Sequence, residues 1–187
     1  MVVIGITGSI ASGKSTVAKL IAKRKYPLFS ADKIVLNLYK KKKFTNLLIK
    51  KFKLKNKKKI KNQIKLIIKK NKEKLKILEN IIHPVVRREM NVFLKKKKKK
   101  FLILEIPLLI ESKLNRYFDN IIFVDTEKKL RLKRYLKRSN DKKTFETLNK
   151  RQISPIIKKK SCDLIINNNY SLAILKKNVK KIIANYE

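Results

Sequence analysis

The feature that most constrains the fold lies close to the N-terminus. Residues 8–15 are GSIASGKS and fit the pattern G-x-x-x-x-G-K-[ST] of a phosphate-binding loop. The β-branched run before it, residues 2–7, is typical of a parallel strand buried on both faces. After it, Val17, Leu20 and Ile21 follow the spacing of one buried helix face. The chain has only three glycines, and all lie in this strand or loop, where the backbone must turn round an anion.

Each position of the loop has an expected role. Backbone N–H groups of residues 9–15 are expected to face phosphate oxygens, at the positive end of a helix that begins near Gly13. Lys14 is expected to reach the β- and γ-phosphates of ATP, and the Ser15 hydroxyl to bind Mg²⁺. The alternative is a chance match on the strand-turn-helix of another α/β protein. The expected nucleotide-binding residues are Gly8, Ser9, Ile10, Ala11, Ser12, Gly13, Lys14, Ser15 and Thr16.

Length and cysteine content limit the class of protein. A chain of 187 residues suffices for one domain with a full core and a small inserted region. One cysteine excludes an internal disulfide and fits a reducing cytoplasm. The first residues carry no basic segment of the kind that opens a signal peptide, and no apolar run approaches the ~18 residues of a membrane span. We therefore expect a cytoplasmic protein that does not enter a membrane.

The net charge of +39 admits two interpretations. A chain this basic binds phosphate backbones at low salt, so a nucleic-acid-binding protein with a nucleotide pocket is one alternative. However, the excess is lysine in runs such as 40–43, 57–59 and 95–100, beside abundant Asn and Ile, as expected of drift in an A- and T-rich genome. The chain also lacks aromatic residues interleaved with the basic ones, on which nucleic-acid bases could stack. It contains no recognisable RNA- or DNA-binding module. We therefore predict no specific nucleic-acid partner.

Alternation of apolar runs and helical patterns predicts an α/β fold with a parallel sheet covered by helices on both faces. Residues 44–82 carry apolar positions at helical spacing and are expected to lie to one side of the sheet. A break is expected at His83 and Pro84, with a new helix starting at Pro84. The expected strands are 2–7, 26–31, 101–106, 120–125 and 163–167; a helix is expected to follow directly at 107–111, and others at 33–43 and 172–186.

Two groups of polar residues stand where ligands of such a sheet bind. Asp32 follows the second strand, and ligands of open parallel sheets bind outside the carboxyl ends of the strands. Its alternative role is to cap the next helix. Arg134 and Arg138 share one helix face and could neutralise a transferring phosphate, or simply be solvated. The single histidine, His83, is by itself more typical of a structural residue.

Several stretches, in order, resemble the dephospho-CoA kinase family, P-loop kinases of coenzyme A biosynthesis. The most specific match is LE-x-x-x-HP-x-V-R followed by PLL-x-E. The stretches are GITGSIASGKSTVA (5–18), SADKI (30–34), LENIIHPVVRRE (78–89), IPLLIE (106–111), RLKRYLKR (131–138), and RQ with CDLIINN (151–168).

The resemblance implies an organisation and a reaction. The fold is a P-loop three-layer αβα sandwich with a five-stranded parallel sheet. The reaction is ATP- and Mg²⁺-dependent phosphorylation of the ribose 3′-hydroxyl of dephospho-CoA, the last step of coenzyme A biosynthesis. Another small-molecule P-loop kinase, acting on a nucleoside or nucleotide, is the enzymatic alternative. Within one domain, the core spans 1–32, 96–133 and 153–187, a helical substrate-binding region spans about 33–95, and a lid spans about 134–152.

The resemblance also implies residue roles. Lys14, Asp32, Arg134 and Arg138 would be catalytic, with Asp32 acting on the substrate hydroxyl. His83 and Arg87 would bind the substrate together with Asp32. Glu105 is a weaker candidate for a second carboxylate near the metal, because its side chain could face the helices.

Departures from the family pattern affect the loop and the substrate region. Glycine is common in the family at positions 9 and 11, so the loop is expected to form with Ser9 and Ala11 only if both avoid positive φ. Asn56 and Lys57 replace an Asp-Arg pair. This removes a guanidinium group that could bind a phosphate or pyrophosphate through two parallel hydrogen bonds. Cys162 and Tyr170 replace Ala and Gly. The sequence gives no indication of oligomeric state.

Overall fold

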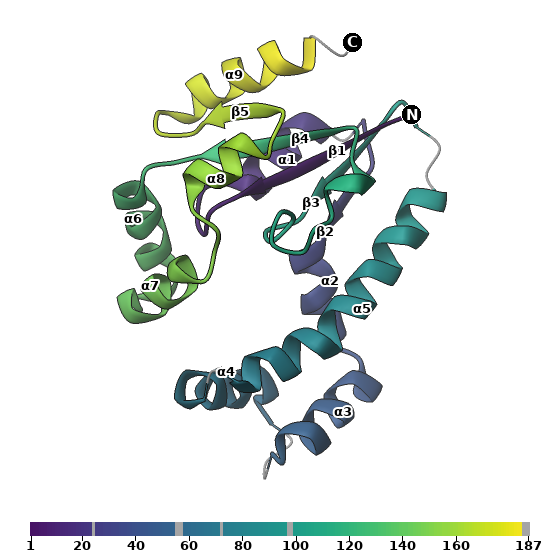
Figure 1. Cartoon of the computed structure of the whole chain (residues 1–187), viewed down its shortest axis with the longest axis vertical. Helices are drawn as coiled ribbons and strands as arrows, with labels where there is room; N and C mark the ends of the chain where they lie inside the picture. The colour runs from purple at the N-terminus through teal and green to yellow at the C-terminus, as the bar shows by residue number, and fades with distance from the viewer. Residues whose placement is uncertain (24, 55–57, 72, 97–98, 185–187) are drawn as a thin grey trace. The chain divides into compact units, whose positions relative to one another are not determined.

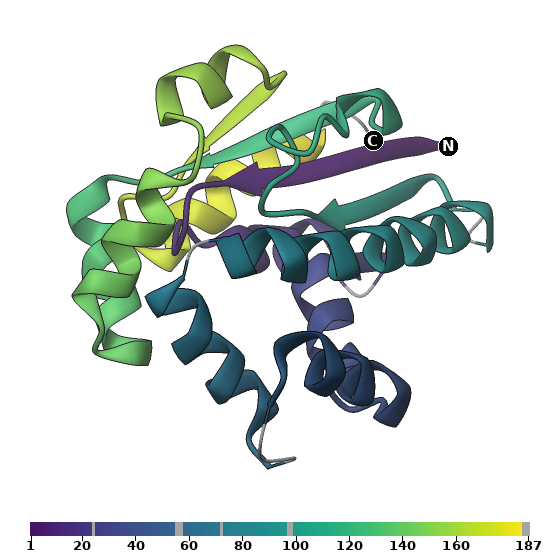
Figure 2. The ribbon, with the colours of Figure 1, turned by 60° about the horizontal axis from the view of Figure 1, so that its bottom comes forward.

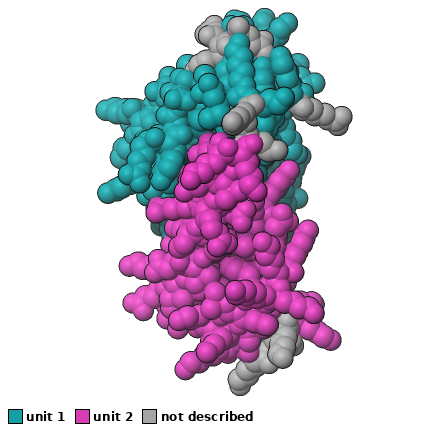
Figure 3. Space-filling model, turned by 90° about the vertical axis from the view of Figure 1, so that its right-hand side faces the viewer, with its two compact units in different colours: residues 1–30, 97–187 teal, residues 31–96 magenta. Residues whose placement is uncertain are grey.

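The computed structural model describes residues 1–23, 25–54, 58–71, 73–96 and 99–184. The chain forms two compact units, which Figure 3 shows in different colours. The first unit consists of residues 1–30 and 97–187, and the second of residues 31–96.

The first unit is built on a parallel sheet with β1 at its centre (Figure 1). The strand order is β2-β3-β1-β4-β5, and every neighbouring pair is parallel. This confirms the predicted α/β fold, although β2 is shorter than the expected strand over 26–31. The strands are β1 (Val2–Gly8), β2 (Leu28–Ser30), β3 (Phe101–Glu105), β4 (Asn120–Asp125) and β5 (Leu164–Asn167).

Helices α1 (Lys14–Ala22) and α9 (Leu172–Ala184) cover one face of the sheet. The main core lies between them and the strands. The central strand is buried almost along its whole length, as its β-branched sequence predicts. The predicted last helix is confirmed as far as Ala184, and its final residues lie outside the described part of the chain. The fully buried side chains of this core include Ile4, Ile6, Val17, Ile103, Ile122 and Val124.

The opposite face of β1 carries a close approach that requires glycine. A Cβ placed on Gly5 would lie 2.8 Å from side-chain atoms of both Leu109 and Phe118. The segment that follows β3 therefore packs directly on the central strand. The short helix α8 (Pro155–Lys160) contacts β4 and then leads into β5.

The helix predicted at 107–111 is wrong. The chain forms turns there, followed by the short 3₁₀ helix η1 (Asn115–Tyr117). Of residues 107–111 only Leu109 is fully buried, so the segment lacks the buried stripe that holds a helix against a sheet. Lys113 adopts φ 53, which ends the turn. Burial against the sheet therefore overrides the helical pattern of this segment.

Helices α6 (Lys128–Ser139) and α7 (Lys142–Lys150) follow β4 and lie side by side (Figures 1 and 2). The rings of Tyr135 and Phe145 pack between them with centroids 5.5 Å apart. The side chain of Asp141 caps α7 by accepting a hydrogen bond from the Thr144 N–H at 2.9 Å. These two helices span most of the region expected to form a lid.

The second unit is helical, as the spacing over 44–82 predicts. Its helices are α2 (Ala31–Leu38), α3 (Lys42–Phe52), α4 (Ile60–Lys70) and α5 (Glu73–Lys96). The helix expected over 33–43 is thus divided between α2 and the start of α3. Its core contains Leu38, Phe44, Leu48, Phe52 and Ile64.

The break predicted at His83 and Pro84 is also wrong, because α5 continues through both residues. Proline removes one helical hydrogen bond, leaving the carbonyl of Asn80 without its usual donor. Pro84 and Asn80 are both exposed, so water can reach that carbonyl. Apolar residues on both sides of Pro84, such as Ile81 and Val85, pack on one core and keep the helix continuous. Within the described residues, no helix is long and apolar enough to cross a membrane.

Candidate active site

Glycine is required at both ends of the phosphate loop. A Cβ on Gly8 would lie 2.7 Å from the carbonyl oxygen of Val124. Gly13 adopts φ 94 at the N-cap of α1, and a Cβ there would overlap the side-chain amide of Asn168. Both positions therefore exclude larger residues, as the motif requires.

The loop does not satisfy the expectation that Ser9 and Ala11 avoid positive φ. Ala11 adopts φ 59, a left-handed conformation that disfavours a residue with a Cβ by about 1–2 kcal/mol. Ser9 is not among the residues with positive φ. Surrounding contacts that hold the loop therefore outweigh the backbone strain at Ala11.

The carbonyl of Ser12 is one such contact. It accepts hydrogen bonds from Thr126 Oγ1 at 2.9 Å and from Asn168 Nδ2 at 2.7 Å. Thr126 follows β4 and Asn168 follows β5, so the loop is tied to the carboxyl ends of both strands. Sequence reasoning missed both residues, although each directly follows a predicted strand.

Lys14 is buried in the loop, with 8% of its surface exposed. Its ammonium donates hydrogen bonds to the carbonyls of Gly8 at 3.1 Å and Ser9 at 2.9 Å. The loop therefore holds a positive charge inside its own curve, where an anion would be bound.

Glu105 faces the loop and not the helices, which removes the reason for ranking it as a weaker candidate. Its carboxylate accepts hydrogen bonds from Ser15 Oγ at 2.5 Å and from Ser30 Oγ at 2.9 Å. Glu105 is 4% exposed and ends β3, next to β1 in the sheet. Ser15 itself is exposed. The loop serine and a carboxylate from a neighbouring strand are the two protein ligands with which P-loop proteins hold Mg²⁺, so these residues fit the metal.

No cluster of three or more His, Cys, Asp or Glu side chains suited to a metal occurs in the part of the chain that the structure describes. Mg²⁺ in nucleotide sites is usually held by one or two protein oxygens together with waters and substrate phosphates. The Ser15–Glu105 pair meets this requirement.

The structure separates the two predicted arginines of α6. Arg134 donates from Nη2 to the carbonyl of Asn168 at 3.0 Å, and its Nη1 lies 4.0 Å from a Cβ position on Gly13. That Nη1 is buried and has no hydrogen-bond partner among the described residues. Arg134 therefore lies against the start of α1, whereas Arg138 is exposed one turn further along α6.

Three expected substrate residues belong to the second unit. Asp32 is exposed in the first turn of α2, which begins at Ala31, so it is not the residue that precedes the helix as the capping alternative requires. His83 is half-buried and Arg87 is exposed, and they lie one turn apart on α5. Helices α2 and α5 contact each other.

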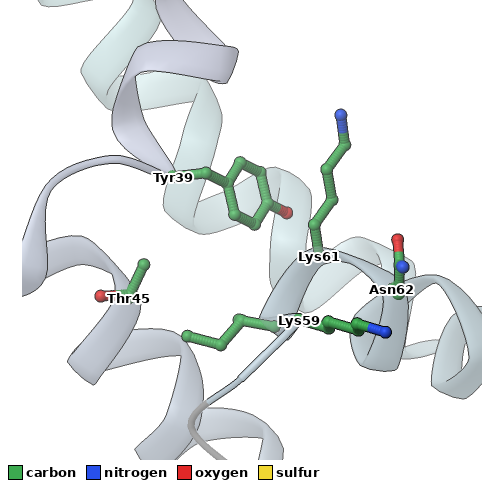
Figure 4. Close-up of a pocket in the computed structure, with 6 residues that line it drawn as sticks. Tyr39, Thr45, Lys59, Lys61 and Asn62 are labelled. Atoms are coloured by element: carbon green, nitrogen blue, oxygen red, sulfur yellow. The ribbon is translucent and has the colours of Figure 1, made fainter.

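A pocket of about 410 Å³ also lies in the second unit (Figure 4). Asp32, His83 and Arg87 do not line it. Burial raises the pKa of Tyr39 and so favours its neutral hydroxyl. The lining residues are Tyr39, Thr45, Lys59, Ile60, Lys61 and Asn62.

Sequence reasoning also missed two residues that contact the crest of the loop at Ile10. They are Arg131 on α6 and Gln152, which follows α7. Arg131 is buried, and this burial lowers its pKa, while the charges of Asp125 and Glu146 oppose the shift. A signal for Arg131 existed, since it is the first of three arginines spaced along one helix.

The loop joins the central strand to α1, its lysine lies within the curve of the loop, and its serine contacts a carboxylate from the neighbouring strand. These features define a P-loop nucleotide-binding protein.

Comparison with known proteins identifies the family. A sequence model of dephospho-CoA kinases matches residues 2–173. A dephospho-CoA kinase of Fusobacterium nucleatum is 36% identical over 186 residues, covering 97% of this chain and 96% of the relative. The solved dephospho-CoA kinase from Campylobacter jejuni is 31% identical, with a TM-score of 0.67 and coverage of 98% of this chain and 96% of that one. For TT1252 from Thermus thermophilus the identity is 28%, the TM-score 0.79, and the coverage 98% and 97%. The chain belongs to the dephospho-CoA kinase family.

Proposed function

We propose that this protein transfers the γ-phosphoryl group of ATP to the ribose 3′-hydroxyl of dephospho-CoA, giving CoA and ADP in the cytoplasm. The observation that carries the proposal is the Ser15–Glu105 pair at 2.5 Å beside a phosphate loop with a buried lysine. The choice of acceptor is supported by relatives of that name, which match nearly the whole chain.

In this proposal the loop binds the nucleotide. Backbone N–H groups within residues 8–16, other than that of Ile10, which donates to Gln152, bind phosphate oxygens. Lys14 moves its ammonium from the loop carbonyls to the β- and γ-phosphates. Ser15 and Glu105 would hold Mg²⁺, which would supply positive charge to the phosphates when bound. Arg134 and Arg138 stabilise negative charge on the transferring group from a lid over residues 134–152.

The reaction breaks one phosphorus–oxygen bond and forms another. The bond between the γ-phosphorus and the β,γ-bridging oxygen breaks and its electron pair stays on ADP, while the acceptor 3′-oxygen bonds to the γ-phosphorus. Asp32 orients the hydroxyl and accepts its proton. His83 and Arg87 bind the acceptor as part of a substrate-binding region over residues 33–95.

Substitutions within this family pattern bear on acceptor affinity rather than on reaction type. Asn56 and Lys57 lie outside the described residues. Lysine at position 57 keeps the positive charge of an arginine but loses its planar fork. Cys162 is half-buried after α8, and Tyr170 is 64% exposed beyond β5.

An acceptor panel tests the proposal directly. The full chain is incubated with Mg-ATP and either dephospho-CoA, adenosine or AMP, and ADP release is measured. We expect ADP release well above background with dephospho-CoA but not with adenosine or AMP. The Lys14→Ala variant should release no ADP with any of the three acceptors. Release with adenosine or AMP instead would assign the chain to a different acceptor, and no release with any of the three would overturn the kinase proposal.

A further inference from the structure

Arg131 connects three parts of the first unit through a buried guanidinium. Its Nε donates to the carbonyl of Thr126 at 3.0 Å, and its Nη1 donates to Asn149 Oδ1 at 2.7 Å and to the carbonyl of Ile10 at 3.4 Å. Only 3% of the residue is exposed, and its Cζ lies 5.8 Å from the ring centroid of Phe145. Arg131 thus joins the end of β4, helix α7 and the crest of the phosphate loop.

Gln152 contacts the other backbone polar group of the same loop residue. Its Oε1 accepts a hydrogen bond from the backbone N–H of Ile10 at 2.8 Å. The N–H of Ile10 is therefore held by Gln152 and its carbonyl by Arg131. Both peptide groups that flank Ile10 are consequently restrained by residues more than one hundred positions away.

The segment that carries Gln152 is itself anchored. The backbone N–H of Ile153 donates to Glu111 Oε1 at 3.2 Å. The same oxygen pairs with the ammonium of Lys158 at 2.6 Å, and the Lys158 side chain is fully buried. A buried ion pair therefore fixes the backbone next to Gln152, so Gln152 approaches Ile10 from an anchored position.

We propose that Arg131 and Gln152 are positioning residues for ATP, acting through Ile10 of the phosphate loop. The two side chains hold Ile10 by its N–H and its carbonyl, so that the other N–H groups of the loop remain aimed at the phosphates. The guanidinium also places a fixed positive charge behind the loop, where burial limits its screening. This role differs from that of Arg134, a residue of α6 whose guanidinium lies beside Gly13 at the start of α1. The inference rests on the proposed use of ATP but not on the identity of the acceptor.

Two substitutions test the contacts. Gln152→Met keeps a long unbranched side chain but removes the acceptor for the Ile10 N–H, and we expect it to weaken ATP binding by about 3- to 10-fold. Arg131→Lys keeps the charge but loses the fork that reaches three acceptors, and we expect a loss of about 10-fold or more. Matched controls are Asn115→Met and Arg116→Lys, exposed residues of η1, for which ATP binding should not change.

The measurements are the Kd of Mg-ATP by calorimetry without acceptor, the KM of each substrate, and the melting temperature. We expect Kd and KM for ATP to rise while KM for the acceptor and melting of Gln152→Met stay near wild type. The double variant should lose less than the product of the two single losses, because both act through Ile10.

An unchanged Kd for ATP in Gln152→Met, or parallel rises in KM for both substrates, would overturn the proposal. Gln152 is only half-buried, so this variant decides the matter even if Arg131→Lys fails to fold. ATP binding is measured without acceptor. A wild-type protein that binds ATP but phosphorylates another acceptor would therefore disprove the proposed function without affecting this inference.

Discussion

At the scale of single residues, Asp32 is the side chain on which the proposed acceptor chemistry depends. It is exposed in the first turn of α2, where a carboxylate also interacts favourably with the positive end of the helix. A catalytic role and a purely structural role therefore predict different consequences of removing its charge.

We expect Asp32→Asn to lower kcat by roughly 10²-fold or more, because the amide cannot accept the proton of the hydroxyl. ATP binding and melting should change little. A purely structural Asp32 would instead leave kcat unchanged and cost about 0.3–1 kcal/mol of stability. Steady-state kinetics and thermal melting of the variant distinguish the two, and a fully active Asn variant would remove Asp32 from the catalytic residues.

Cys162 provides a pH-dependent prediction. Burial, assisted by the charge of Asp163 and opposed by that of Lys158, raises the pKa of its thiol to about 11. A raised pKa favours the neutral thiol in the folded state, so this contribution to stability is present below the pKa of the unfolded thiol and is lost as pH rises through 11.

We therefore expect iodoacetamide to modify the folded protein at pH 8 about 100-fold more slowly than the denatured protein, because the thiolate is the reactive form. Modification should accelerate as pH approaches 11. Mass spectrometry of timed samples measures both rates, and equal rates in the folded and denatured protein would contradict the burial effect.

At the scale of elements, several helices end without the glycine that usually occupies this position. Lys23, Lys53 and Asn140 follow α1, α3 and α6, each in the left-handed conformation. All glycines of the chain lie in or beside the phosphate loop, so these ends carry the backbone strain that glycine would avoid.

Lys53→Gly is expected to stabilise the protein by up to about 1 kcal/mol, since removing the Cβ relieves a φ of 51. Part of that gain is offset by the greater freedom of glycine in the unfolded chain. The matched control, Lys50→Gly inside α3, should destabilise by about 1 kcal/mol. Chemical denaturation gives both values, and destabilisation by both variants would refute the capping effect.

The two predicted arginines of α6 offer a second comparison within one element. Arg134 uses one guanidinium nitrogen on the carbonyl of Asn168 and leaves a buried second nitrogen for a phosphate. A lysine cannot supply this geometry, so Arg134→Lys should lower kcat by at least about 10-fold. Arg138→Lys, at an exposed position, should have a smaller effect. Full activity of both variants in the ADP-release assay would show that Arg134 and Arg138 have no catalytic role.

At the scale of the whole molecule, the net charge of +39 dominates the interactions of the surface with polyanions. We interpret it as lysine enrichment without a nucleic-acid readout surface. Affinity for duplex DNA should therefore fall about 10³-fold or more between 50 and 200 mM salt, as counterion release requires. Fluorescence anisotropy with two unrelated duplexes measures this dependence, and sequence-selective binding at 200 mM salt would refute the interpretation.

The sequence by itself determined the α/β class, the five parallel strands and the position of the phosphate loop. These features are local: a buried parallel strand is a continuous apolar run, and a phosphate loop needs its glycines and lysine at fixed spacing. The roles of the expected catalytic and substrate-binding residues stay predictions, because they depend on bound substrates; these residues are Lys14, Asp32, His83, Arg87, Arg134 and Arg138. The expected helix at 107–111 and the expected break at Pro84 failed because burial, rather than local pattern, decided those segments.

Only the tertiary structure decided which distant side chains meet at the loop. Glu105 approaches Ser15 because β3 is the neighbour of β1, and strand order is not encoded in the periodicity of either strand. Arg131 and Gln152 contact Ile10 across separations of 121 and 142 residues. Ala11 accepts a left-handed conformation for the same reason: contacts made by residues from the far end of the chain outweigh a local backbone preference that the sequence alone would favour.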